Sequence, residues 1–263
     1  MIKLVVWLIF LAFSSYALFC FFLYLQQRRI LYYPVQAATS PGMPVITLEN
    51  ENEKLRINAA QKGYKTALIY FGGNAESVAL NFSQFNHLFH RADLYFMNYR
   101  GYGGSSGSPT EQGLFSDGLA LYDEIISRYD SVIVAGRSLG SGVALYLASK
   151  RDVAGIVLMT PYDSMVSLAS HHYPFMPVKL LLKDRYESVS YIPLVNAPIL
   201  FVIAENDEII PRKKSENLIG AVSHDRIRVT VIQGAHHNNF EAYPQFESAI
   251  RSFLDYLDEE QLR

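Results

Sequence analysis

Residues Ser131–Lys150 read SVIVAGRSLGSGVALYLASK, and their order of strand, turn and helix is the strongest indication of the architecture of this chain. An apolar run of strand length, Ser131–Ala135, leads into Gly136-Arg137-Ser138-Leu139-Gly140, and an apolar stretch of helix length follows. A strand, a tight turn that lifts a serine, and a helix whose first amides face the reacting oxygen together form a nucleophile elbow. The stretch therefore predicts an α/β fold in which Ser138 is a catalytic nucleophile.

The G-x-S-x-G pattern occurs a second time, at Gly103–Gly107, so the pattern alone does not choose between two serines. Short patterns of this kind also arise by chance, and their structural context must decide. The residues after Ser105 are typical of a loop that precedes a later helix, because Ser108-Pro109-Thr110-Glu111 reads as a helix start. We interpret Ser105 as a loop residue and keep Ser138 as the nucleophile.

Further apolar runs on both sides of the elbow define the fold class. Two short strands are expected first, and the later runs are compact and continuous, which is typical of strands covered on both faces. Helix-length stretches separate them, so we predict a mostly parallel central sheet flanked by helices. The stretch 162–192, rich in aromatic residues, Leu and Pro, breaks this rhythm and is predicted to be a short cap insertion. The runs begin at Val45, Lys54, Ala67, Ala92, Ser131, Ala154, Ala197 and Arg226.

A serine nucleophile needs a general base, and the base needs a carboxylate to orient it. Asp207 lies in an acidic turn after the apolar run at Ala197, at a strand end where the sites of open α/β sheets gather. Asp163, which follows the preceding strand, is the alternative acid. The base is expected on the loop after the last strand, where His236 and His237 are adjacent and spacing alone does not separate them.

The reaction also requires donors for the oxyanion that forms on the substrate. One donor is expected to be the amide of Leu139, directly after the nucleophile. The other is expected from the loop after an earlier strand, Phe71-Gly72-Gly73-Asn74-Ala75-Glu76, where two glycines allow a close backbone approach. The amide of Asn74 is the candidate on that loop. Nothing in the sequence implies a cofactor or a metal ion.

The N-terminal residues Leu4–Leu25 carry no charge, and a helix of them, at about 1.5 Å per residue, just crosses a hydrocarbon core of roughly 30 Å. We predict a single-pass membrane anchor over residues 1–30, a linker over 31–44 and a catalytic domain over 45–263. A cleaved signal peptide is the alternative, but its apolar region would be shorter. Lys3 faces Arg28 and Arg29 across the span, so the side of the membrane stays open. We expect this helix to position the domain without building its site.

Composition excludes other partners and chemistries. The 263-residue chain has a formal net charge of -2 and no cluster of Lys and Arg beyond short pairs, so no nucleic-acid partner is expected. Its one cysteine, Cys20, lies in the apolar N-terminal run, so the domain has no disulfide and no cysteine-based metal site.

Six segments together resemble the small membrane-anchored α/β-hydrolases whose domain is similar to the serine aminopeptidase type. The resemblance runs from about Ile30 to Leu257. It implies Ser138 as nucleophile, Asp207 as acid and His237, rather than His236, as base. One position departs from the pattern, because relatives commonly have His where this chain has Gly72, and the support of that side chain is lost. The segments are LYYP, FGGNAES, NYRGYGGSSGSPTEQGL, GRSLGSG, NAPILFVIAENDEIIP and GAHHNN.

The sequence thus predicts a serine hydrolase that cleaves an ester, thioester or amide through an acyl-enzyme on Ser138. Its expected substrate is a small-molecule or lipid-like acyl compound, met at a membrane that the N-terminal helix binds. The alternative is a membrane-tethered scaffold that has kept the fold and lost the chemistry. A dehalogenase on the same fold would have an Asp where Ser138 stands.

Overall fold

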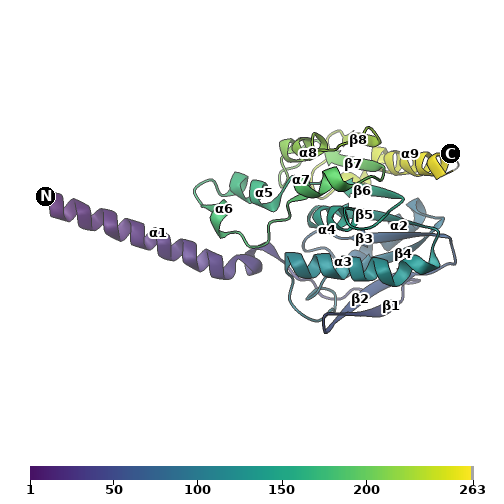
Figure 1. Cartoon of the computed structure of the whole chain (residues 1–263), viewed down its shortest axis with the longest axis horizontal. Helices are drawn as coiled ribbons and strands as arrows, with labels where there is room; N and C mark the ends of the chain where they lie inside the picture. Colours follow the sequence, from purple (N-terminus) through teal and green to yellow (C-terminus); the bar gives the residue numbers. More distant parts are fainter. Residues whose placement is uncertain (262–263) are drawn as a thin grey trace.

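The computed structural model describes residues 1–261, which form one eight-stranded sheet with helices on both faces and a long helix projecting from one end (Figure 1). The order of strands across the sheet is β1-β2-β4-β3-β5-β6-β7-β8. The strands are β1 Val45–Asn50, β2 Glu53–Ala60, β3 Thr66–Phe71, β4 Ala92–Met97, β5 Ser131–Arg137, β6 Gly155–Met159, β7 Ile199–Ala204 and β8 Ile227–Ile232.

The sheet is parallel from β4 to β8, and β2 pairs antiparallel with both β1 and β4. The central strands β4, β6 and β7 are buried at every residue, because helices cover both faces of the sheet. At the edge, β1 alternates between half-buried and exposed positions. The predicted mostly parallel α/β sheet flanked by helices is confirmed.

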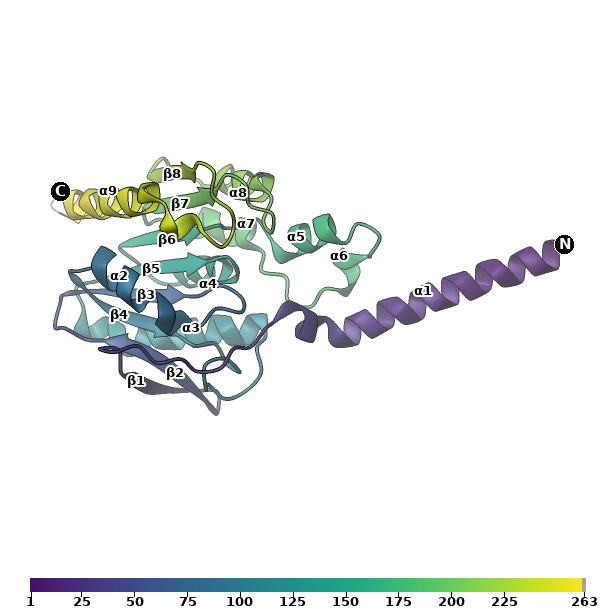
Figure 2. The same ribbon diagram turned by 180° about the vertical axis from the view of Figure 1, so that it is seen from behind.

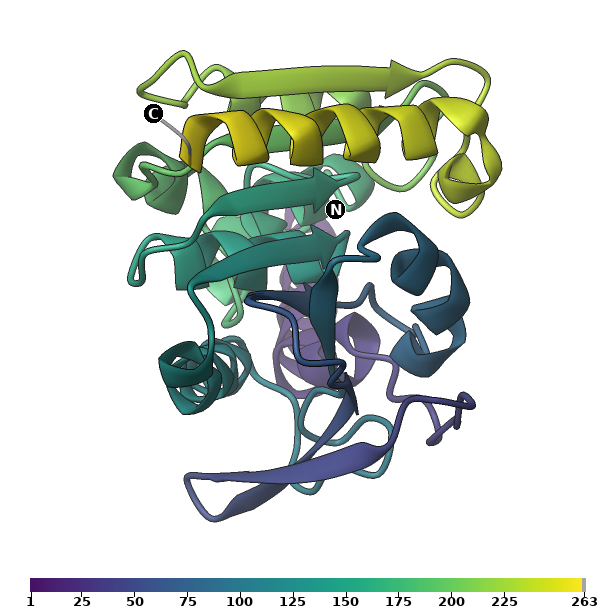
Figure 3. The ribbon, with the colours of Figure 1, turned by 90° about the vertical axis from the view of Figure 1, so that its right-hand side faces the viewer.

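Two apolar cores lie on the two faces of the sheet. One core packs α3 (Glu111–Ile125), α4 (Leu139–Ala148) and α8 (Arg212–Ile219) against the sheet. The other packs α2 (Phe82–Leu88) and α9 (Pro244–Gln261) against the opposite face. Figure 3, viewed from the end opposite α1, shows the strands stacked from β8 at the top to the β1–β2 hairpin at the bottom.

Two short helices of the stretch 162–192 lie at the end of the molecule from which α1 (Ile2–Leu31) projects (Figures 1 and 2). The stretch predicted as an insertion, 162–192, contains α5 (Met165–His172), α6 (Val178–Leu181) and α7 (Ser188–Tyr191). Figure 2 shows α5 and α6 beside the C-terminal end of α1. The short 3₁₀ helices are Val78–Asn81, Ile126–Arg128, Ile192–Leu194 and Phe240–Ala242. The division into anchor, linker and domain stays a prediction.

Candidate active site

Ser138 lies on a strained turn between β5 and α4. Its backbone has φ 49° and ψ -116°, a left-handed conformation that side chains rarely adopt and that costs of order 1–3 kcal/mol. The flanking glycines make the turn possible, because a Cβ on Gly136 would lie 2.3 Å from the carbonyl oxygen of Gly140. A Cβ on Gly140 would lie 2.1 Å from the carbonyl oxygen of Phe71, at the end of β3.

The structure brings Ser138, His237 and Asp207 together at the carboxyl ends of β5, β8 and β7. Ser138 Oγ lies 3.1 Å from His237 Nε2, and His237 Nδ1 lies 2.8 Å and 3.0 Å from the two carboxylate oxygens of Asp207. The side chains of His237 and Asp207 are 6% and 3% exposed. The amides of Ile209 and Ile210 donate to Asp207 Oδ1 at 2.9 Å and 2.7 Å and fix the orientation of this carboxylate.

The alternative residues have other partners. Ser105 Oγ accepts from the amide of Arg56 and donates to the carbonyl of Asn98, as a loop-fixing serine would. The carboxylate of Asp163 accepts hydrogen bonds from the amide of Ser164, at the start of α5, and from the side chains of Ser167 and Asn217. The side chain of His236 is 56% exposed, and its Nδ1 lies 3.3 Å from Glu208.

The loop after β3 lies directly beside Ser138. A Cβ on Gly73 would lie 3.7 Å from the Cβ of Ser138, and the Gly73 amide donates to Glu76 Oε2 at 2.7 Å. Among residues 1–261, no acceptor binds the amide of Asn74. The amide of Leu139 lies in the first turn of α4, where helix amides have no partner within the helix.

Gly72 has no room for the histidine that the family pattern would lead one to expect. A Cβ there would lie 2.6 Å from Cγ1 of Val78. The loop is supported differently in this chain, because the hydroxyl of Tyr99 donates to the carbonyl oxygen of Gly72 at 2.7 Å. Tyr99 is fully buried, and burial raises its pKa well above the ordinary value, which keeps the hydroxyl a donor.

A buried ionic cluster lies behind the site and joins its three loops. Arg137, the residue before Ser138, lies 3.2 Å from Glu76 of the loop after β3 and 3.6 Å from Glu241 near the histidine loop. Burial raises the pKa of Glu241. Burial acts to lower the pKa of Arg137, but the carboxylates of Glu241 and Glu76 more than offset it, so the pKa is raised. The side chains of Arg137, Glu76 and Glu241 are all largely buried, so water cannot readily take the place of either ion-pair partner of Arg137. The cluster therefore fixes the relative positions of the three loops.

The side chain of Asn74 binds the C-terminal end of α1. Its Nδ2 donates to the carbonyl of Leu31 at 2.6 Å, and its Oδ1 accepts from the amide of Tyr33 at 3.0 Å and the hydroxyl of Tyr102 at 2.8 Å. We expected the N-terminal helix to position the domain without building its site, and this stays a prediction, because Leu31 and Tyr33 belong to the segment predicted as a linker. Nothing in the local sequence signals a contact between residues so far apart in the chain.

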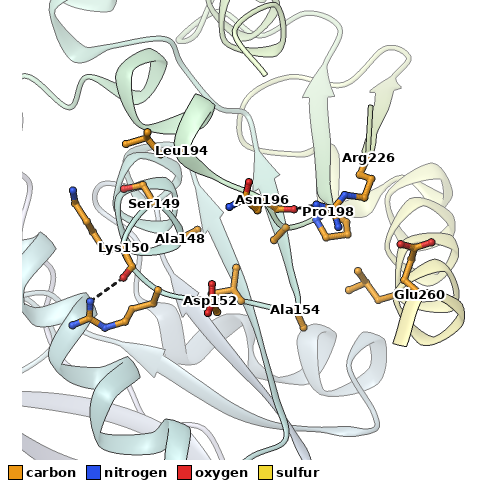
Figure 4. Close-up of a pocket in the computed structure, with 14 residues that line it drawn as sticks. Ala148, Ser149, Lys150, Asp152, Ala154, Leu194, Asn196, Pro198, Arg226 and Glu260 are labelled. Atoms are coloured by element: carbon orange, nitrogen blue, oxygen red, sulfur yellow. Dashed lines mark hydrogen bonds between the residues drawn. The ribbon is translucent and has the colours of Figure 1, made fainter. Parts of the chain in front are cut away.

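A cavity of about 470 Å³ lies between α1, α5 and α6 and extends to Asn74. Its lining is mostly apolar and includes Leu23, Leu31, Met165, Leu168, Ala169, Met176 and Leu181. A second hollow, of about 630 Å³, lies at the amino-terminal ends of β6, β7 and β8, where the α4–β6 loop approaches the start of β7 (Figure 4). Its polar residues, such as Lys150, Asp152, Asn196 and Arg226, lie far along the strands from Ser138. Within residues 1–261, no three His, Cys, Asp or Glu side chains are grouped to hold a metal ion.

Comparisons with known proteins agree with this architecture. Residues 66–186 match the α/β-hydrolase fold family. An uncharacterized protein of Mycobacterium tuberculosis is 33% identical over 252 residues, which cover 89% of each chain. The chain therefore belongs to the α/β-hydrolase fold family, and the resemblance inferred from its motifs is confirmed at that level.

More distant relatives extend the comparison. Alpha/beta hydrolase domain-containing protein 17C of Xenopus laevis is 28% identical over 204 residues, which are 74% of this chain and 63% of that protein. Among solved structures, Pyrococcus furiosus esterase Pf2001 has a TM-score of 0.67 at 18% identity and covers 86% of this chain and 98% of its own. Mouse alpha/beta hydrolase domain-containing protein 10 has a TM-score of 0.64 at 17% identity, covering 82% and 99%. At these identities the solved structures show the fold.

Proposed function

We propose that this protein is a serine hydrolase that cleaves an ester, thioester or amide of a small acyl compound. The hydrogen-bonded chain from Ser138 through His237 to Asp207 carries the proposal. The fold, and the esterase among the similar structures, support a hydrolase. No other group of side chains in residues 1–261 combines a serine on a strained turn with a buried imidazole and carboxylate.

The proposed reaction follows from the two hydrogen bonds of His237. With its Nδ1 proton donated to Asp207, Nε2 accepts the Ser138 proton as Oγ attacks the carbonyl carbon of the substrate. The oxyanion that forms is stabilised by the amides of Leu139 and Asn74. The imidazolium then gives its proton to the leaving group, an acyl-enzyme remains, and a water molecule activated by His237 releases the acid.

The test compares the two serines of the repeated pattern. Ser138→Ala should abolish labelling by a fluorophosphonate probe and lower kcat for p-nitrophenyl butyrate roughly a million-fold. Ser105→Ala should keep both within a few-fold, because Ser105 binds only backbone groups. Thermal unfolding of each variant checks that it is folded. Equal activity of Ser138→Ala and the parent chain would refute the proposal. A folded parent chain that neither reacts with the probe nor cleaves any ester of a chain-length series would favour the scaffold alternative.

We also propose that α1 anchors the chain in a membrane. Among residues 1–261, α1 is the one helix long and apolar enough to span a bilayer, and most of its side chains are exposed. The full-length chain should stay in the membrane fraction after carbonate extraction, with its N-terminus intact. Release by carbonate, or a mature N-terminus beyond Leu25, would show instead a soluble chain or a cleaved signal.

A further inference from the structure

Residues 175–183 of the predicted cap insertion run alongside the C-terminal half of α1. The carbonyl of Phe175 accepts from the hydroxyl of Tyr16 at 2.7 Å, and the carbonyl of Leu181 accepts from Gln27 Nε2 at 3.0 Å. The amide of Lys183 donates to Gln27 Oε1 at 2.7 Å. These contacts advance along the cap as they advance along α1, so residues 175–183 form a second layer beside the helix (Figures 1 and 2).

A salt bridge fixes the end of this layer. Arg28 binds the carboxylate of Asp184 through two hydrogen bonds, of 2.8 Å and 3.1 Å. Asp184 is buried and also accepts from the amide of Glu111, at the start of α3. The ammonium of Lys183 lies 4.0 Å from the ring centroid of Tyr24. Charged groups therefore gather at the level of residues 24–28, where α1 would leave the hydrocarbon layer.

The tip of the cap lies deeper than these charges. Tyr16 is nine residues before Leu25, the last residue of the uncharged stretch, which corresponds to about 14 Å of helix. A cap that touches α1 at Tyr16 must enter the apolar layer that α1 crosses. The side chains at the tip suit this environment, because Tyr173, Phe175 and Leu180 are 56%, 86% and 85% exposed in the isolated chain.

The cavity between the cap and α1 joins this layer to the candidate site. Leu23 and Met176 line its wall on the membrane side, and Asn74 and Tyr33 line the end beside the oxyanion loop. Its volume of about 470 Å³ is within the range of about 300–1,000 Å³ typical of small-molecule sites. An apolar chain that follows this cavity would extend from the bilayer as far as Asn74, whose neighbour Gly73 lies beside Ser138.

We propose that this cavity binds the acyl chain of a membrane lipid, which enters sideways from the bilayer between α1 and the cap. The inference rests on the proposed hydrolase function and on the anchoring of α1. The carbonyl carbon of the lipid ester bonds to Ser138 Oγ, the lipid alcohol leaves with the proton held by His237, and water then releases the fatty acid. The anchoring helix is one wall of the substrate site.

Two adjacent residues of α5 offer a matched test. Ala169 lines the cavity, whereas Ser170 lines a different hollow on the other side of the cap. Ala169→Trp fills the cavity, and Ser170→Trp adds the same side chain outside it. The full-length chain in phosphatidylcholine nanodiscs is assayed with p-nitrophenyl butyrate and p-nitrophenyl palmitate. Each methylene that a blocked cavity would leave in water costs roughly four-fold in binding. A tryptophan that displaces three or four of them should lower kcat/KM for the palmitate ester by about a hundred-fold.

The butyrate ester separates the possible outcomes. Ala169→Trp should leave its hydrolysis within about three-fold, and Ser170→Trp should leave both esters unchanged. Equal loss of both esters in a folded Ala169→Trp protein, or no loss of either, would overturn the acyl-chain site while leaving the hydrolase proposal intact. Activity that persists in Ser138→Ala would instead overturn the hydrolase proposal itself.

The depth of the cap gives an independent measurement. Because Cys20 is the only cysteine, Cys20→Ala permits single cysteines to be introduced at Phe175 and, as a control, at the exposed Leu80 of the domain. An environment-sensitive fluorophore at Phe175→Cys should be quenched by brominated acyl chains in the nanodisc, and one at Leu80→Cys should not. Equal, weak quenching at both positions would show that the cap stays in water and would overturn the inference.

Discussion

Gly140→Ala tests whether the turn at Ser138 and the oxyanion loop are held together as closely as the structure indicates. The added Cβ would lie 2.1 Å from the carbonyl oxygen of Phe71, 2.6 Å from its carbonyl carbon and 2.7 Å from the carbonyl oxygen of Gly72. All three are backbone atoms that cannot rotate away. Carbon–oxygen contacts are normally about 3.3–3.6 Å, so α4 and the loop after β3 must separate by roughly 1 Å.

The two costs of this separation differ in size. Overpacking a core costs about 1–3 kcal/mol, and the better helix propensity of Ala returns about 1 kcal/mol, so stability should fall by roughly 0–2 kcal/mol. A shift of 1 Å between reacting groups can cost about a hundred-fold in rate. The expected result is therefore a folded protein with a small loss in Tm and a hundred-fold loss in kcat/KM for p-nitrophenyl butyrate.

The control is Gly220→Ala at the end of α8, where the nearest atom to the new Cβ lies at 3.4 Å and neither activity nor Tm should fall. If Gly140→Ala kept kcat/KM within two-fold of the parent chain, the loop would not need its close approach to α4. The assignment of the second oxyanion donor to this loop would then fail.

Three further changes give distinct results. Asp207→Asn should lower kcat roughly ten-thousand-fold with little change in Tm, because the imidazole of His237 loses the acceptor that sets its tautomer; a smaller loss than ten-fold would contradict the role of this carboxylate. Arg28→Ala should cost about 1–3 kcal/mol of unfolding free energy in detergent, since the buried Asp184 keeps only neutral donors, and an unchanged Tm would count against the contact. Burial raises the pKa of Glu241 above 4.5, so the protonated carboxyl stabilises the folded chain below that pH, and this stabilisation is lost as the pH rises through the folded-state pKa. The free energy of unfolding of Glu241→Gln in urea should therefore rise relative to that of the parent chain from pH 4 to pH 8. A constant difference between the two free energies over this range would contradict the prediction.

The fold could be predicted from the sequence because a strand that is buried on both faces appears as a continuous apolar run. The runs at Ala92 and Ala197 are continuous, and β4 and β7 are buried at every residue. The order of the strands in the sheet has no such local signal in the sequence. β4 lies between β2 and β3, and an apolar run does not specify which neighbour it pairs with. The antiparallel edge formed by β1 and β2 was likewise beyond the pattern of apolar runs.

The candidate site could be predicted where one element carries the whole signal. The elbow at Ser138 is such an element, because strand, glycines and helix are consecutive. The choice between His236 and His237 depends on which of two adjacent rings turns inward, and only the family resemblance indicated it. The support of Gly72 by Tyr99, and of Asn74 by Leu31, joins segments far apart in the chain, and such contacts follow from the packing of the whole fold.

With α1 anchored in a membrane as proposed, the contact between Asn74 and Leu31 would place the reaction close to the membrane surface. Leu31 is six residues beyond Leu25, so the oxyanion loop meets α1 about 9 Å beyond the end of the uncharged stretch. Raising an acyl chain by that distance into water would cost roughly 0.8 kcal/mol for each methylene exposed. The cavity along α1 would replace the lost lipid contacts with Leu23, Leu31 and Leu181, so in the proposed binding mode the chain stays in apolar surroundings as far as Asn74. Because the same asparagine binds α1 and carries the candidate oxyanion donor, a displacement of the helix would move the donor as well as the cavity wall.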